Sequence, residues 1–228
     1  MPRSATRAAA VLLALGALAY TAWVLEVLVR TGLDPVRTYV SELAAADQPL
    51  GGLFRATDLT AGLLVLAGAA TGLAAAVRRG HPPRERWALG GWIALAVFGA
   101  ATVADSRLPL SCTPTADPEC AARETAGLVP ATHTAHAVSS SLAMTGALAA
   151  MVALTAAARR YGHWRALART GPALVVLELA ATAWTLAAVA AFEAGRGVWS
   201  LGAGQRLQVL LVAVWLAVLA YSLAREER

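Results

Sequence analysis

Charged side chains are scarce in this chain, and lysine does not occur at all. Only 14% of the 228 residues are charged, whereas about a quarter are charged in a soluble domain. Aromatic residues make up only 6%, so the hydrophobic share of 58% comes mainly from Ala, Leu and Val. Most of the apolar stretches also lack the polar stripe every ~3.6 residues that marks a water-soluble helix. These deficits argue against a soluble helical domain and favour a membrane protein.

Several motifs that would identify a function are also missing. No Gly-x-Ser-x-Gly elbow surrounds Ser41, and the glycines of residues 195–204 form neither a Rossmann nor a P-loop fingerprint. The net charge of +5 could indicate nucleic-acid binding. The arginines have a membrane explanation instead, so we expect no nucleic-acid partner.

The chain contains six long apolar stretches, each close to the roughly 20 residues that a helix needs to cross a bilayer. A lipid-exposed segment must satisfy its own backbone polar groups, so each stretch is predicted to be a helix. The stretches cover about residues 8–29, 59–77, 87–104, 134–157, 172–191 and 207–223. The sequence therefore predicts one all-α domain over residues 1–228, a polytopic membrane bundle of six transmembrane helices.

Arginine is unevenly divided between the two sides of these helices. One side consists of the two tails and the connections after the second and fourth helices. Its arginines are Arg3, Arg7, Arg78, Arg79, Arg84, Arg86, Arg159, Arg160, Arg165, Arg169, Arg225 and Arg228. Short cytoplasmic loops carry the arginine excess in membrane proteins. Both termini are therefore predicted to be cytoplasmic, in the plasma membrane, with three longer loops outside.

The first apolar stretch has a second interpretation. Arg3, Arg7 and the segment Ala17–Ala19 resemble a signal peptide with its cleavage site. The apolar run continues to Val29, which is too long for a typical signal core. An uncleaved membrane anchor is therefore favoured.

Cys112 and Cys120 both fall in the second outer loop. Thiols outside the cytoplasm tend to oxidise, so a disulfide that stiffens the loop is the favoured interpretation. A Cys/His metal site is the alternative, although the spacing does not match a standard zinc pattern.

His133 and His136 lie three residues apart at the start of the fourth predicted helix, so they share a face. Asp105 ends the third helix at a similar depth. A histidine pair and a carboxylate could hold Zn²⁺ or perform acid–base chemistry, so all three are candidate catalytic and metal-binding residues. The alternative is structural, with both histidines hydrogen-bonded to Asp105, Glu124 or the backbone.

The first outer loop is dense in polar groups. Ser41 and Glu42 are a candidate nucleophile and base. Arg37, Arg55 and Asp58 are candidate binding residues. The favoured alternative is a capped amphipathic helix that lies on the membrane surface.

Three further binding candidates lie on the last two helices. Glu178 falls within the fifth helix, where a carboxylate is costly and is a functional candidate by default. Gln205 and Arg206 open the sixth helix. Arg206 could pair with Asp105, Glu42 or a lipid phosphate.

Short motifs along the chain resemble a known family. They are residues 40–44 (Val-Ser-Glu-Leu-Ala), Leu53-Phe54-Arg55, Asp105, the histidine-bearing entry to the fourth helix, and Gly204-Gln205-Arg206-Leu207. This pattern resembles the prokaryotic membrane family catalogued as domain of unknown function 998 (DUF998). The resemblance implies a six-helix membrane architecture and no established activity.

A weaker similarity is to membrane hydrolases of the alkaline ceramidase type, which place Ser, Asp and three His around zinc. Ser41, Asp105, His133 and His136 are the same residue types, but His81 and His163 fall at the cytoplasmic turns.

Two functions follow from these patterns. The first is a membrane protein that binds a lipid, a small molecule or a partner through its outer face. The second is an outward-facing hydrolase for a lipid-like substrate, with zinc as a possible cofactor. Membrane lipids are the expected surroundings in both cases.

Overall fold

The computed structural model describes residues 3–78 and 85–225. Arg79, His81, Arg84 and Arg228 lie outside the described residues. Within the described ranges the chain is all-helical. The helices are α1 (Arg3–Tyr20), α2 (Gly51–Arg78), α3 (Arg86–Asp105), α4 (Pro118–Thr125), α5 (Ala131–Tyr161), α6 (Arg165–Glu193) and α7 (Leu201–Arg225), with 3₁₀ helices η1 (Ala22–Val27) and η2 (Val40–Ala44).

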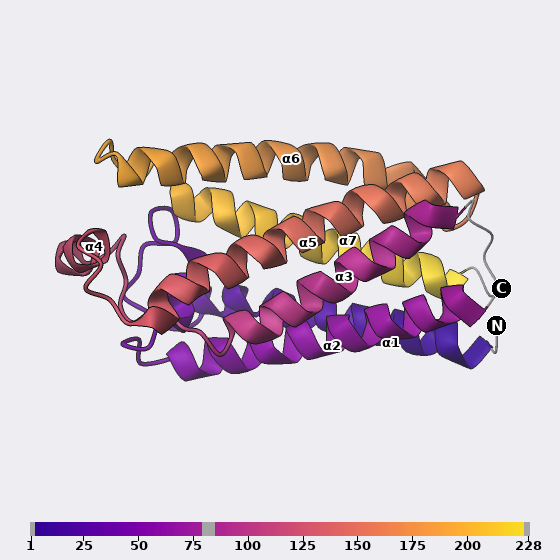
Figure 1. Ribbon diagram of the computed structural model, residues 1–228, viewed down its shortest axis with the longest axis horizontal. Helices are drawn as coiled ribbons and strands as arrows, with labels where there is room; N and C mark the ends of the chain where they lie inside the picture. The colour runs from indigo at the N-terminus through magenta and orange to yellow at the C-terminus, as the bar shows by residue number, and fades with distance from the viewer. Residues whose placement is uncertain (1–2, 79–84, 226–228) are drawn as a thin grey trace.

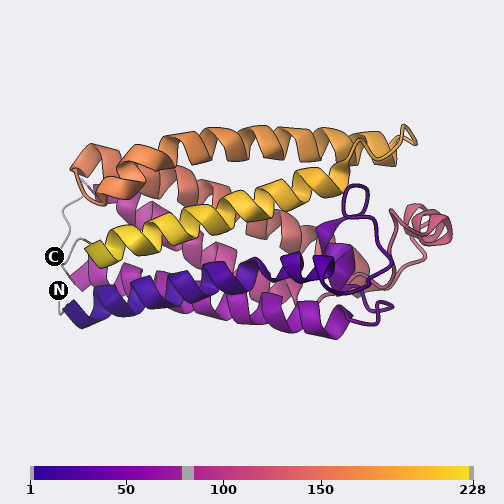
Figure 2. The ribbon, with the colours of Figure 1, turned by 180° about the vertical axis from the view of Figure 1, so that it is seen from behind.

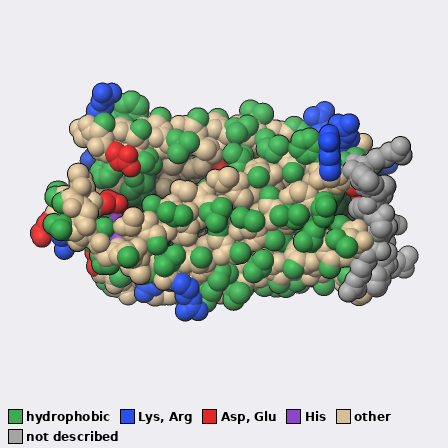
Figure 3. Space-filling model, in the orientation of Figure 1, with side chains coloured by type: hydrophobic (Ala, Val, Ile, Leu, Met, Phe, Trp, Pro, Cys, Tyr) green, Lys and Arg blue, Asp and Glu red, His purple; other side chains and the backbone are tan. Residues whose placement is uncertain are grey.

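Six segments are long and apolar enough to cross a membrane, which confirms the predicted number. They are Ser4–Val27, Gly51–Val77, Arg86–Asp105, Ala131–Tyr161, Arg165–Glu193 and Leu201–Arg225. Apolar side chains cover the middle of the molecule in Figure 3, and charged side chains gather mainly toward its two ends. The chain is therefore a multi-pass membrane protein.

Several predicted helix bounds were wrong. The first span is not one α-helix over residues 8–29, because α1 ends at Tyr20 and a 3₁₀ turn follows. The second helix begins at Gly51 rather than near residue 59. Arg55 and Asp58 made its first two turns look like a loop, yet both are only partly exposed. The helices predicted over 134–157, 172–191 and 207–223 each extend further at both ends.

The long helices form a closed ring in the order α1, α2, α3, α5, α6, α7 (Figures 1 and 2). Each packs on its neighbour in sequence, and α7 packs back on α1. The centre of the ring holds fully buried large side chains, including Leu13, Phe98, Met151, Trp215 and Leu219. Small residues let the backbones of α2 and α3 approach closely: a Cβ added at Gly99 would lie 2.6 Å from the Leu66 amide nitrogen.

The two ends of this ring differ in construction. We call the end with residues 30–50, 106–130 and 194–200 the loop end, and the opposite end the termini end, because both chain ends lie there (Figure 1). The small helix α4 lies beyond the ring at the loop end.

The predicted surface helix in the first long loop was wrong. Residues 40–44 form the short helix η2, in which Glu42, Leu43 and Ala44 are buried. Leu43 and Ala44 pack with Phe54 in a second small core. This segment therefore packs into the loop end of the ring, with its apolar residues against Phe54 of α2.

Candidate functional site

A cavity of about 130 Å³ lies inside the loop end of the ring. It forms where α1, α3 and the starts of α2, α5 and α7 meet, with η1 and η2 above. Its lining residues are Tyr20, Trp23, Val40, Ser41, Leu43, Ala44, Phe54, Asp58, Thr102, Asp105, Ser140, Ala143, Met144, Gln205, Gln208 and Val209. Four predicted site residues therefore meet here: Ser41, Asp58, Asp105 and Gln205.

Asp105 is the most densely contacted polar group of this wall. Its Oδ1 accepts a hydrogen bond of 2.9 Å from Ser140 and another from Ser139. The same oxygen lies 3.2 Å from His136 Nδ1. His136 Nε2 in turn lies 3.3 Å from the Ser140 hydroxyl. Asp105, His136 and Ser140 are thus in mutual contact at the edge of the cavity.

The surroundings of His136 identify its tautomer. Nδ1 lies 2.9 Å from the Leu108 carbonyl oxygen, which can only accept a hydrogen bond. Nδ1 therefore carries a proton, and the tautomer with this proton alone has Nε2 as an acceptor toward Ser140. This arrangement leaves Ser140 with two possible acceptors, Asp105 and His136.

Asp58 makes no hydrogen bond or ion pair with any residue that the structure describes. Its carboxylate faces the cavity from α2, on the same cavity as Asp105. The indole N–H of Trp23 is a second polar group of the lining without a partner in the described chain. Buried polar groups in proteins nearly always have a partner, so the Trp23 N–H needs an explanation. Asp58 is partly exposed, and no residue of the described chain pairs with its charge.

Arg206 fixes to α7 the two segments that cover the cavity, η1 and η2 with the residues leading into it; together these are called the cover. Its Nε and Nη2 donate to the two carboxylate oxygens of Glu26 at 2.6 and 2.7 Å, and Nη1 donates to the Thr38 carbonyl at 2.8 Å. The Arg206 and Glu26 side chains are 7% and 5% exposed. The protein partner is thus Glu26 rather than the expected Asp105 or Glu42, because η1 turns Glu26 inward.

Gln205 of α7 and Arg55 of α2 also bind the cover, at the two ends of η2. Gln205 Oε1 accepts the Val40 N–H at 2.9 Å. Arg55 Nη1 donates to the carbonyls of Ala44 and Ala45 at 2.7 and 3.1 Å. Both residues are therefore structural for η2, and Gln205 also lines the cavity. Arg37 is exposed on the loop surface, away from these contacts.

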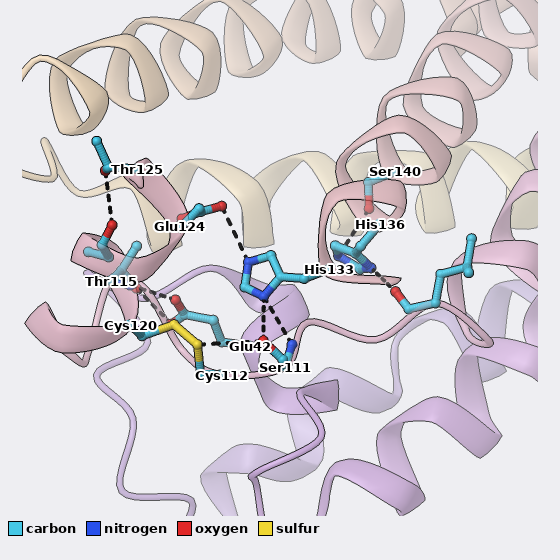
Figure 4. A network of polar contacts seen from close by, with 12 residues as sticks. Glu42, Ser111, Cys112, Thr115, Cys120, Glu124, Thr125, His133, His136 and Ser140 are labelled. Atoms are coloured by element: carbon cyan, nitrogen blue, oxygen red, sulfur yellow. Dashed lines mark hydrogen bonds and ion pairs between the residues drawn. A yellow bond between two sulfur atoms is a disulfide. The ribbon is translucent and has the colours of Figure 1, made fainter. Parts of the chain in front are cut away.

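Glu42 points away from the cavity, toward the loop that Cys112 and Cys120 close (Figure 4). The predicted disulfide is confirmed. Thr115, inside this loop, donates to Glu42 through its N–H at 2.7 Å and its hydroxyl at 2.6 Å. Burial raises the pKa of Glu42 to about 7, and the two Thr115 bonds oppose that rise. Glu42 thus joins the disulfide loop to η2.

His133 also belongs to this network rather than to the cavity. Its Nδ1 accepts the Ser111 N–H at 3.1 Å, and its Nε2 lies 3.3 Å from Glu124 (Figure 4). Nδ1 is thus unprotonated, so the ring is neutral and Nε2 carries the proton. The two predicted histidines therefore face different partners. The described residues contain no group of three or more His, Cys, Asp or Glu that could hold a metal ion.

Glu178 lies on α6, which contributes no residue to the cavity lining. It is fully buried, and its Oε2 has no partner in the described structure. The Thr182 hydroxyl makes a long contact of 3.5 Å with Oε1 and accepts from Gln208 Nε2 at 2.9 Å. Gln208 lines the cavity, so this contact chain connects Glu178 to it.

Sequence reasoning missed Tyr20, Trp23, Met144 and Gln208 as cavity residues. Gln208 offered a signal, because an amide inside an apolar helix is exceptional in a membrane span. Tyr20 and Trp23 offered a weaker one, since each combines an aromatic ring with a polar tip near a span end. The inward turn after Tyr20 had no signal in the pattern of apolar residues.

A model of the family described as "Protein of unknown function (DUF998)" matches residues 6–222. The chain belongs to the DUF998 family. The match covers four membrane spans of this DUF998 protein in full and nearly all of the first and last, and it includes every residue of the cavity. Searches of the curated proteins and of the solved structures found no match.

Proposed function

We propose that this DUF998 protein binds a small molecule, or the polar group of a lipid, in the cavity at its loop end. The observation that carries the proposal is the Asp58 carboxylate, which faces the cavity and has no partner among the described residues. Asp58 is only partly exposed and the Trp23 N–H of the same lining is buried, so both groups have lost hydration free energy without gaining a partner in the described chain. A ligand that supplies the partner would recover that free energy.

The size and lining of the cavity support the same proposal. Small-molecule sites are mostly apolar and carry a few placed polar groups. This cavity has that mixture, with Phe54, Met144 and Val209 beside Asp58 and Asp105. A dry engineered cavity of about 150 Å³ takes up benzene, so a volume of about 130 Å³ suits a ligand group of a few heavy atoms.

Thermal unfolding of the purified protein tests the proposal. A panel of cationic, neutral and anionic compounds of this size is added, and a compound that binds only the folded state raises the Tm. Ala143→Leu fills the cavity, while Ala137→Leu adds the same group on an exposed face of α5. We expect ligand-dependent shifts in the wild type and in Ala137→Leu but not in Ala143→Leu. Equal shifts in all three proteins, or none with any compound, would disprove the proposal.

We also propose that the loop end faces away from the cytoplasm. The arginine excess at the termini end supports this orientation, and the disulfide at the loop end suits an oxidising compartment. The described chain has no free cysteine, so Asp47→Cys and Ser4→Cys give exposed single thiols at the loop end and the termini end. An impermeant maleimide should label only Asp47→Cys in intact cells. Labelling of Ser4→Cys alone would reverse the orientation.

A hydrolase is the second candidate, and the contacts among Ser140, His136 and Asp105 favour it. Their residue types match a Ser-His-Asp triad, and His136 Nε2 faces the hydroxyl as a general base would. It ranks second because Ser140 lies closer to Asp105, at 2.9 Å, than to His136, at 3.3 Å. A fluorophosphonate probe, which reacts with activated serines, should label the wild type and not Ser140→Ala if this candidate is correct. Ser41→Ala is the matched control on the same cavity.

A further inference from the structure

The charges around the cavity are unbalanced. Asp58 and Asp105 both line it, whereas none of its lining residues is Arg or His. Two arginines at the starts of α2 and α7 already have partners, Arg55 backbone carbonyls and Arg206 the Glu26 carboxylate. Only His136 stands beside one of the two carboxylates. A ligand that completes this site would bring positive charge.

Three aromatic side chains select among possible cations. Tyr20, Trp23 and Phe54 line the same cavity as the two carboxylates. Aromatic faces attract ammonium groups, most strongly where the cation has left water. A bare metal ion would leave most of a cavity of about 130 Å³ empty and would gain nothing from an apolar wall. An ammonium group with methyl or methylene carbons uses both kinds of wall.

We propose that the cavity binds an organic ammonium group, carried by a free amine or by a lipid headgroup, with Asp58 as its counter-ion. This inference rests on the proposed function and specifies its ligand class. Asp58 accepts no hydrogen bond and forms no ion pair in the described chain, so it is available for the ligand. The Trp23 indole N–H, also without a partner there, would serve a hydroxyl or ester oxygen a short distance from the nitrogen.

The test compares choline and ethanolamine with dimethylbutanol, in which a carbon atom replaces the quaternary nitrogen of choline. The shape is kept and only the charge is lost. The Kd of each is measured from the rise in Tm with concentration, with sodium chloride and calcium chloride alone as further probes. We expect choline or ethanolamine to bind and dimethylbutanol to bind at least tenfold more weakly.

Asp58→Asn separates the counter-ion from the fold. The substitution keeps the size and breaks no protein contact in the described structure, so the ligand-free Tm should stay equal or rise. The Kd for the ammonium compound should increase roughly ten- to hundredfold, the effect of losing a charged hydrogen-bond partner. Asp47→Asn makes the same change on an exposed loop residue and should leave the Kd unchanged.

Two results distinguish this inference from the proposed function. If dimethylbutanol binds as well as choline and Ala143→Leu abolishes both, the cavity is a binding site but the ammonium assignment is wrong. A Tm rise with sodium or calcium chloride and none with choline would overturn the assignment as well. If Ala143→Leu removes the Tm shift of no compound, the proposed function and the ammonium assignment both fail. An unchanged ammonium Kd in Asp58→Asn would remove Asp58 from the site.

The source of the ammonium group is tested in nanodiscs. Choline titrations are compared in bilayers of phosphatidylethanolamine and of an uncharged glycolipid without an ammonium group, so that neither surface attracts choline by net charge. A weaker apparent Kd for choline in phosphatidylethanolamine would identify a competing headgroup as the source. An equal Kd in both bilayers would identify a free amine.

Discussion

The two ends of the bundle use charge in opposite ways. At the termini end several arginines are exposed, among them Arg159, Arg160, Arg165 and Arg169. At the loop end the charged groups Glu26, Glu42 and Arg206 are buried and bonded to other segments. Exposed charge at a membrane boundary sets orientation at little structural cost. Buried charge acts on the fold itself, so substitutions at the two ends should differ sharply in their effects.

The largest difference is expected between Arg206→Ala and Arg169→Ala. The first leaves Glu26 buried without its partner and frees the Thr38 carbonyl, which should cost about 3–5 kcal/mol of unfolding free energy. The second removes an exposed arginine and should change stability by less than about 0.5 kcal/mol. Thermal unfolding of both variants in one detergent measures the contrast. Similar losses at the two ends would break the comparison.

Glu42 should make stability depend on pH. Its folded pKa of about 7 lies above the ordinary value of 4.5, so the folded state binds the proton more tightly than the unfolded state does. Its contribution is therefore most favourable below pH 4.5, declines between pH 4.5 and 7, and stays constant above. The total change is at most about 3 kcal/mol.

A Tm series from pH 4.5 to 8 measures this decline, and Glu42→Gln should flatten it. Glu85 at the termini end is the matched position for a Glu→Gln control. If the wild-type Tm rises from pH 4.5 to 7, and no other titrating group accounts for the rise, the assignment to Glu42 is contradicted.

Loss of the disulfide should have an intermediate effect. Cys112 and Cys120 are eight residues apart, and cross-linking a loop of this length contributes about 2–3 kcal/mol by chain entropy. The paired Cys112→Ser and Cys120→Ser substitutions should lower the Tm. They should also speed hydrogen exchange in α4 and at the Thr115 amide, while exchange at the termini end stays the same. Faster exchange throughout the ring would show that the loop is not an independent unit.

The smallest effect is expected within the loop end itself. Glu124 is 44% exposed where it meets His133, so Glu124→Ala should cost less than about 1 kcal/mol. His133 is buried and also accepts the Ser111 N–H, so His133→Ala should cost more. Unfolding of the two variants thus shows whether burial, rather than position in the bundle, decides the cost.

The sequence predicted the parts of this fold that depend on span length and composition. Six apolar stretches and an oxidisable cysteine pair are properties of local composition, and both were correct. The start of α2 was missed because the charged residues Arg55 and Asp58 suggested a loop. In the structure Arg55 binds the Ala44 and Ala45 carbonyls and Asp58 faces the cavity, so both fit inside a helix. Polarity reports that a group needs a partner, but only the packed structure supplies it.

The candidate site was predicted in part for the same reason. His136, Asp105 and Asp58 come together, since each lies near the end of a predicted helix and those ends meet. Ser41 reaches the same cavity from the loop, through η2. His133 and Glu42 were predicted at the same depth as these residues and are also a histidine and a carboxylate. They bond instead to residues 106–130, His133 to Ser111 and Glu42 to Thr115. Helix register gives which face a side chain shares, whereas the path of residues 106–130 decides its partner. That path has no periodic signal in the sequence.

The closure of the ring has a consequence for biosynthesis. Tyr20 and Trp23 leave the ribosome early, whereas Gln205 and Gln208 emerge near the end of translation, and all four form one cavity. Until α7 docks on α1, Glu26 lacks its ion-pair partner Arg206. The nascent protein therefore carries an unpaired carboxylate through most of its synthesis, and a chain that stops before α7 has neither the charge pair nor the site.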